Sequence, residues 1–260
     1  MGFLSIAHSD VGIKKDTNQD SVLIKQASTD YGEVLLSVIC DGMGGLAKGE
    51  VASAALIRAF SEWFEKELPF ILYEERQAKE INYNSLQKSW NELIDQVNHR
   101  IADYGAGFHA PCGTTLVALL LIDHQYYIVN VGDSRTYILN ESLHQITRDQ
   151  TYVQQEMDEG RMTPEEARNH PQRNVLLQCV GASQVVIPDF YQGEYQKDEV
   201  FILCSDGFRH LITDEEFVKI LNPRLLTDEK SMRDAAIYCT ELNKQRKESD
   251  NISVVIIKTD

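Results

Sequence analysis

The sequence has few positive charges, no paired cysteines and no long apolar run, and each shortage excludes a class of protein. It contains 25 Lys and Arg against 40 Asp and Glu, which gives a formal net charge of -15. Proteins that bind the nucleic-acid backbone take much of their affinity from Lys and Arg, and no basic patch is visible here. The composition therefore argues against a nucleic-acid partner.

The five cysteines are scattered singly, with no C-x-x-C pair. This spacing favours neither a zinc site nor a disulfide framework. Cys40 and Cys204 each lie just before an acidic turn and could act as nucleophiles. Each also completes an apolar run, so we interpret both as buried core residues.

The length and the apolar content set the expected organisation. A chain of 260 residues with 43% hydrophobic residues can bury a full core. No linker, internal repeat or low-complexity tract divides it, so we expect one domain over residues 1–260. No apolar segment approaches the length that spans a membrane. We therefore expect a cytoplasmic monomer with no membrane partner.

Three separate apolar runs end on an aspartate beside a glycine, at Asp41, Asp133 and Asp206. Because each run is apolar on both faces, it predicts a fully buried strand that delivers its aspartate where the chain leaves the core. A single Asp-Gly pair predicts only a turn. Asp20 and Asp250 stand at the mouths of two further strands. We therefore expect all five carboxylates to gather at one edge of the sheets.

The remaining pattern indicates the fold class. Apolar residues at helical spacing predict long helices over about 51–68, 86–104 and 228–247, and Thr213 begins another helix with Glu216 in the capping-box position. The strands come in antiparallel runs rather than alternating one for one with helices. This order favours an α+β protein with two sheets and helices outside them. The weakly patterned segment 148–193, with a short helix near 165–169, is typical of a functional or disordered insert.

Gathered carboxylates imply a particular chemistry. Like charges so close repel by about several kcal/mol unless cations neutralise them. Oxygen ligands select Mg²⁺ or Mn²⁺ over Zn²⁺, and none of the 7 histidines has a metal-binding spacing such as H-E-x-x-H. Two ions held about 3.5–4 Å apart convert a bridging water into a hydroxide that attacks phosphorus in line. The pattern therefore predicts phosphoester hydrolysis without a covalent enzyme intermediate.

At the same residues the chain resembles the metal-dependent protein phosphatases of the PPM, or type-2C serine/threonine, family of bacterial type. The motifs run in family order from Ser9 to Ile257: SDVGIKKDTNQDS, VICDGMGGLAKGEVAS, CGTTLVALL, VGDSRTYIL, ITRDQTYVQQ, GRMTPEEARNHPQRN, LCSDGF and SDNISVVII. The resemblance implies a four-layer αββα sandwich, in which two mainly antiparallel sheets are flanked by pairs of helices. It also implies a phosphoserine/phosphothreonine protein phosphatase that uses Mn²⁺ or Mg²⁺.

The resemblance assigns a metal-binding role to residues at matching motif positions. Asp41 would bridge two ions, the Gly42 carbonyl would bind one of them, and Asp206 and Asp250 would complete the other. Asp20 would sit beside the centre, directly or through a water. Catalysis would then depend on Asp41, Asp206 and Asp250 through the water that the ions activate.

Further roles follow from the same resemblance. Asp133, with Asp206, would match a third-metal site of bacterial-type members. Gln19 and Asn251 would support the centre, and the segment 148–193 would form the family's flap beside it. The implied partners are phosphorylated proteins, substrates of a partner Ser/Thr kinase.

Three positions depart from the family pattern. Lys15 stands where most members have an arginine that grips the substrate phosphate, so we expect weaker phosphate binding without the bidentate fork. Gln19 replaces a glutamate that is a metal ligand in some members. Met43 stands where animal members place a histidine thought to protonate the leaving group, and methionine cannot act as a general acid.

Two other functions remain open from the sequence. A regulatory pseudophosphatase would bind phosphoproteins without hydrolysing them, but such proteins usually lose metal ligands and every acidic position is intact here. A metal-dependent nuclease or phosphodiesterase could use the same ions. The net charge of -15 and the missing basic groove count against it.

Overall fold

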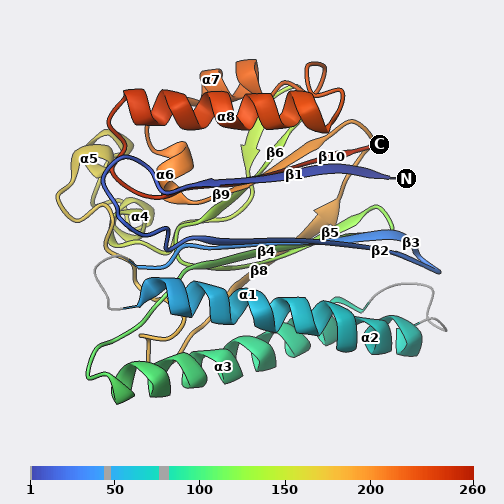
Figure 1. Ribbon diagram of the computed structural model, residues 1–260, viewed down its shortest axis with the longest axis horizontal. Helices are drawn as coiled ribbons and strands as arrows, with labels where there is room; N and C mark the ends of the chain where they lie inside the picture. Colours follow the sequence, from blue (N-terminus) through green and yellow to red (C-terminus); the bar gives the residue numbers. More distant parts are fainter. Residues whose placement is uncertain (1, 44–47, 76–81) are drawn as a thin grey trace.

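The computed structural model describes residues 2–43, 48–75 and 82–260, so Gly44 and Gly45 of the glycine-rich motif lie outside the described residues. Figure 1 shows four layers, with two stacked sheets between an upper and a lower layer of helices. The protein is therefore an α+β sandwich of the αββα type, as the sequence predicts. No helix among the described residues combines the length and the apolar character needed to cross a bilayer.

Each sheet has five strands, and every neighbouring pair is antiparallel. The first sheet has the order β1-β10-β9-β6-β7, formed by Phe3–Asp10, Ile252–Thr259, Val200–Cys204, Arg135–Leu139 and Leu143–Gln145. The second has the order β2-β3-β4-β5-β8, formed by Ser21–Thr29, Gly32–Cys40, Leu116–Ile122, Gln125–Val131 and Asp189–Glu194. The first and last strands of the chain are thus neighbours in one sheet.

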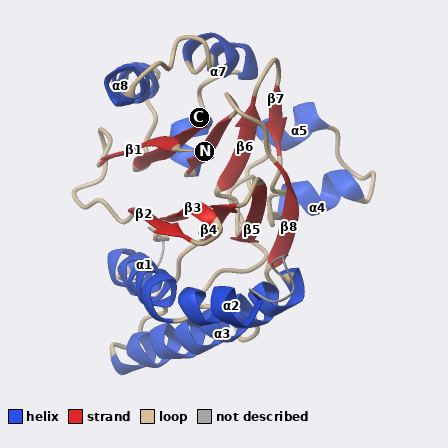
Figure 2. Ribbon diagram, turned by 90° about the vertical axis from the view of Figure 1, so that its right-hand side faces the viewer, coloured by secondary structure: helices blue, strands red, loops and turns tan. Residues whose placement is uncertain are grey.

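Helices cover the outer face of each sheet. The second sheet is covered by α1, α2 and α3, which span Gly49–Lys66, Leu68–Glu75 and Tyr83–Gly107. The first is covered by α7 and α8, which span Asp214–Ile220 and Glu229–Gln245. Three short helices, α4 (Tyr152–Asp158), α5 (Pro164–Asn169) and α6 (Asp206–Arg209), lie at the end of the sandwich opposite the chain termini (Figure 1). Figure 2 shows α4 and α5 on the side of β7 and β8.

The layering explains why the strands are apolar on both faces. In β3, Val34, Leu36 and Val38 belong to the cluster shared with α1 and α3, whereas Leu35 and Ile39 belong to the cluster between the two sheets. All five side chains are fully buried. A strand with helices on one side and a second sheet on the other needs an apolar residue at every position.

Several elements were not predicted from the sequence, namely α2, α4, α6 and β8. The segment 148–193 contains both α4 and β8, and it also holds the short helix that the sequence does predict, α5. In α4 the only buried residue is Val153, and β8 is an edge strand with no fully buried residue. Periodicity cannot identify such elements because most of their residues are only half-buried.

Candidate metal centre

Strand register brings the predicted aspartates to one end of the sandwich. In the second sheet Ser21 pairs with Cys40, so Asp20 and Asp41 lie next to each other where β2 begins and β3 ends. In the first sheet Cys204 pairs with Val254, so Asp206 and Asp250 flank the matching end of β9 and β10. The antiparallel pairing of each sheet therefore determines the placement of four carboxylates.

Hydrogen bonds to its main-chain groups hold Asp41 in place and do not involve its carboxylate. The Asp41 N–H donates to Thr115 Oγ1 at 3.0 Å, and the Asp41 carbonyl accepts from the Thr115 N–H at 2.9 Å and from Thr114 Oγ1 at 3.0 Å. The Thr115 hydroxyl also lies 2.8 Å from Ser134 Oγ, beside Asp133. The threonine pair thus fixes the main chain at the end of β3 without using the acidic side chain.

Gly42, Gln19 and Asn251 tie the surrounding loops together. A Cβ atom on Gly42 would lie 2.5 Å from the Gln19 carbonyl oxygen and 2.5 Å from the Gly49 carbonyl oxygen, so only glycine fits there. The Gln19 N–H donates to Asn251 Oδ1 at 2.9 Å, and Asn251 Nδ2 donates to the Val11 carbonyl at 2.9 Å. These contacts position the turn that carries Asp20.

The carboxylates interact strongly because they are desolvated together. Burial raises the pKa of Asp41 well above its ordinary value, and the charges of Asp20 and Asp206 raise it further. Burial likewise raises the pKa of Asp20 to about 7, a rise that the Ser253 hydroxyl opposes and the charge of Asp206 increases. The cluster is therefore costly to ionise unless positive charge is supplied.

The donor set fits hard divalent cations. Both carboxylate oxygens of Asp20 and Oδ1 of Asp206 are buried, and among the described residues they have no partner in hydrogen-bonding geometry, although the Ser205 and Ser253 hydroxyls lie near Asp20. A buried polar atom without a partner costs free energy, and a bound cation would remove that cost. Oxygen ligands of this kind suit Mg²⁺ or Mn²⁺.

The chain itself already supplies positive charge to two of these aspartates. Lys15 Nζ lies 3.1 Å from Asp250 Oδ1, and Arg209 Nη2 lies 3.5 Å from Asp133 Oδ2. Within residues 2–43, 48–75 and 82–260, no three His, Cys, Asp or Glu side chains lie, as they stand, in a group that could hold a metal ion. The structure thus brings the predicted residues together without closing a coordination shell.

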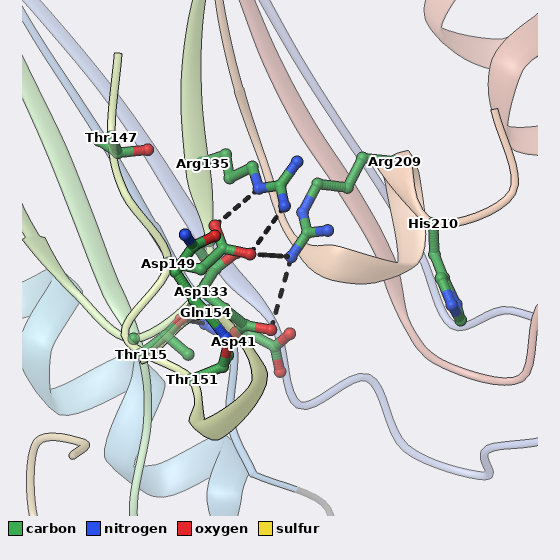
Figure 3. A network of polar contacts seen from close by, with 12 residues as sticks. Asp41, Thr115, Asp133, Arg135, Thr147, Asp149, Thr151, Gln154, Arg209 and His210 are labelled. Atoms are coloured by element: carbon green, nitrogen blue, oxygen red, sulfur yellow. Dashed lines mark hydrogen bonds and ion pairs between the residues drawn. The ribbon is translucent and has the colours of Figure 1, made fainter. Parts of the chain in front are cut away.

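Sequence reasoning missed a second polar network beside Asp133. Arg135 makes a bidentate ion pair with Asp149, with Nε–Oδ1 and Nη2–Oδ2 both at 2.7 Å. Arg209 Nη2 lies 3.5 Å from Asp149 Oδ2 and donates to the Asp133 carbonyl at 2.9 Å. Figure 3 shows both guanidinium groups pointing toward Asp149, with His210 apart from them. One signal was available, since Asp206 and Arg209 have the i, i+3 spacing of neighbours on a helix.

A cavity of about 480 Å³ opens beside this network. Asp133, Asp206 and Arg209 line one side of it, and Met157 and Ala167 of the segment 148–193 line the other. The segment 148–193, which the family resemblance identifies as a flap, therefore borders the acidic cluster.

The two cysteines that precede the acidic turns are core residues. Cys40 and Cys204 are fully buried, and each belongs to a cluster between a sheet and its helices. Burial raises the pKa of the Cys204 thiol to about 12 and that of Cys40 well above its ordinary value. Because the thiolate is the nucleophilic form, neither residue suits nucleophilic attack.

The chain is similar to several known proteins. A model of the family "Protein phosphatase 2C" matches residues 12–240. The serine/threonine phosphatase stp of Listeria monocytogenes serotype 4b is 33% identical over 226 residues, which cover 86% of this chain and 84% of that protein. The crystal structure of serine/threonine phosphatase Stp1 from Staphylococcus aureus is similar with a TM-score of 0.82 at 28% identity, covering 100% of this chain and 96% of that one.

A third relative was crystallised with metal. The catalytic domain of the serine/threonine protein phosphatase PstP, in complex with two manganese ions, is similar with a TM-score of 0.76 at 30% identity and covers 99% of each chain. The family match spans most of the chain, and the sandwich agrees with the fold of the similar solved structures. The chain therefore belongs to the protein phosphatase 2C family, as a phosphoprotein phosphatase of the bacterial PPM type.

Proposed function

We propose that this protein hydrolyses phosphoserine and phosphothreonine monoesters in proteins, using two Mn²⁺ or Mg²⁺ ions at the end of the sandwich. The observation that carries the proposal is the convergence of aspartates from separate strand ends, with buried carboxylate oxygens that have no hydrogen-bond partner among the described residues. The relatives named serine/threonine phosphatases and the PstP complex with two manganese ions support it. We also propose that residues 1–260 act as one domain with 148–193 as its flap.

Each residue of the centre has a distinct task in this proposal. Asp41 and the Gly42 carbonyl would hold one ion, Asp41 would reach the other as well, and Asp206 and Asp250 would complete the second. Asp20 would orient the centre from beside it. Bound divalent ions supply a water of lowered pKa as the nucleophile and neutralise charge on the phosphate. The aspartates determine where the positive charge of the ions lies.

Lys15 is the residue we assign to the substrate phosphate. Its side chain is 31% exposed, and its ammonium group lies 3.1 Å from Asp250, at the border between solvent and the acidic cluster. From there it can attract a phosphate toward the acidic cluster. A lysine offers a point charge rather than the planar fork of arginine, so it would attract the phosphate more than it orients it.

The proposed setting is cytoplasmic signalling. We propose phosphorylated proteins as substrates, supplied by a partner Ser/Thr kinase, because a phosphatase of this kind can act only where a kinase has placed the phosphate. The protein would act as a monomer, away from membranes and nucleic acid.

Hydrolysis assays with three substrates test the proposal. The substrates are a phosphothreonine peptide, para-nitrophenyl phosphate and bis(para-nitrophenyl) phosphate, each with Mn²⁺ and then with excess chelator. We expect turnover of both monoesters that requires Mn²⁺ and disappears in Asp206→Ala. The matched control is Asp103→Ala, which removes an exposed aspartate of α3 and should leave turnover unchanged.

Two outcomes would replace the proposal. Tight binding of the phosphopeptide without metal-dependent turnover would identify a pseudophosphatase. Cleavage of the diester but not of the monoesters would identify a phosphodiesterase.

A further inference from the structure

Arg209 makes an unusual contact for a residue beside a metal centre. It lies at the end of α6, one turn after Asp206, and its side chain is only 13% exposed. Its Nη2 atom donates to the Asp133 carbonyl at 2.9 Å and lies 3.5 Å from Asp133 Oδ2. In Figure 3 the guanidinium group points into the network, toward Asp133 and Asp149. A full positive charge therefore sits against Asp133.

Among the neighbouring charged groups, Arg209 is the cation that contacts Asp133. Asp133, Asp149 and Asp206 all line the same cavity as Arg209. The other guanidinium, that of Arg135, makes its bidentate ion pair with Asp149. Burial raises the pKa of Asp133, and the charges of Arg209 and, to a smaller extent, of Arg135 lower it. Of the two guanidinium groups, Arg209 is the one whose side chain contacts the Asp133 carboxylate. It also offsets Asp206, with which it interacts electrostatically.

A divalent ion on Asp133 would compete directly with this guanidinium. An ion such as Mg²⁺ binds a carboxylate oxygen at about 2.1 Å, so an ion on Asp133 Oδ2 would lie no farther than about 6 Å from Arg209 Nη2 in a partly buried site. An arginine side chain stays protonated in proteins. It cannot relieve the repulsion by losing its charge, and it would have to leave the network.

We propose that the Arg209 guanidinium takes the place of a third divalent ion at Asp133, so that this chain holds two ions and not three. The inference rests on the two-ion centre proposed above, and it differs from the third-metal role that the family resemblance implies for Asp133. Asp133 then acts as a positioning residue, joined through Arg209 to Asp206 on one side and to Asp149 at the start of the segment 148–193 on the other. The positive charge beside Asp133 would then come from Arg209 and would not depend on the supply of metal.

Counting bound Mn²⁺ tests the inference without an activity assay. The count per chain is measured by equilibrium dialysis with elemental analysis and by native mass spectrometry, at saturating Mn²⁺. We expect two ions in the wild type and in Asp133→Asn. We expect three in Arg209→Met, which has a similar length without the charge, and two again when Asp133→Asn is added to it. Arg209→Lys keeps the charge and should stay at two.

Each result has a definite meaning. A wild-type count of three that falls to two in Asp133→Asn would overturn the inference and leave the two-ion centre standing. A wild-type count of zero would overturn the proposed function itself, and the inference with it. A folded Arg209→Met that still binds two ions would also overturn the inference. If Arg209→Met does not fold, the comparison of the wild type with Asp133→Asn decides the question alone.

Discussion

Replacing Asp41 by asparagine should separate the stability of the metal-free protein from its response to metal. The main chain at Asp41 is held by Thr114 and Thr115 and does not depend on the carboxylate, so the fold should be retained. The charges of Asp20 and Asp206 oppose ionisation of Asp41. Removing this carboxylate should therefore leave the metal-free protein at least as stable as the wild type, while the response to Mn²⁺ is lost.

The size of the metal response follows from linkage and chain length. At about 100 times the dissociation constant, an ion that binds only the folded state adds about 2.7 kcal/mol to the free energy of unfolding. Unfolding entropy of about 2.1 cal/mol/K per residue gives about 0.55 kcal/mol/K for a chain of 260 residues. Each ion should then raise the melting temperature of the wild type by about 5 °C.

Differential scanning calorimetry in chelator and in Mn²⁺ measures both effects. The rise in melting temperature with Mn²⁺ should fall to below about 1 °C in Asp41→Asn. Asp103→Asn removes the same charge from an exposed site on α3 and should keep the full rise. An Asp41→Asn protein that retains the wild-type response, or that melts clearly lower in chelator, would refute the reasoning.

Two further predictions concern residues outside the carboxylate cluster. Lys15→Arg should lower KM for a phosphothreonine peptide several-fold, because the guanidinium fork can bind phosphate through two hydrogen bonds. Lys14→Arg, at the exposed neighbouring position, is the control. An unchanged or higher KM in Lys15→Arg contradicts the assignment. Hydrogen bonding to Arg246 lowers the pKa of Glu216 from 4.5 to about 2. The ion pair between Glu216 and Arg246 therefore stabilises the fold above pH 4.5, and this stabilisation is lost as the pH falls toward 2. Glu216→Gln should therefore melt below the wild type at about pH 6, with the difference disappearing near pH 2, and a difference that persists there refutes the ion pair as its cause.

The sequence predicts the architecture because burial on both faces of a strand leaves a clear pattern. Val34 to Cys40 could be read as a buried strand without knowing what covers it, and the structure shows helices on one side and a sheet on the other. The same reasoning placed the strand-end aspartates, since antiparallel register brings alternate strand ends to one edge. The same reasoning does not predict α4 and β8, because their residues are mostly half-buried and leave no clear period to detect.

The polar network around Asp133 was harder to predict, for a physical reason. Whether a carboxylate faces a metal, an arginine or water depends on side-chain contacts between segments that are distant in sequence. Asp133 meets Arg209, which lies 76 positions further along the chain. The helix that carries Arg209, α6, has only four residues and is too short for helical periodicity to indicate it.

The site separates the groups that hold the chain from the groups that would do chemistry. Main-chain atoms and neutral side chains fix the loops: Thr115 holds the end of β3, Asn251 holds the turn before β2, and Ser205 Oγ accepts from the Ser253 N–H at 3.1 Å where β9 meets β10. In the part of the chain that the structure describes, the carboxylates of Asp20 and Asp206 take little part in this and keep buried oxygens without a partner in hydrogen-bonding geometry, although the Ser205 and Ser253 hydroxyls lie near Asp20. Because fold and charge depend on different atoms, carboxylate substitutions should change metal binding far more than structure. Substitutions at Thr115 or Asn251 should instead displace the aspartates while leaving their number unchanged.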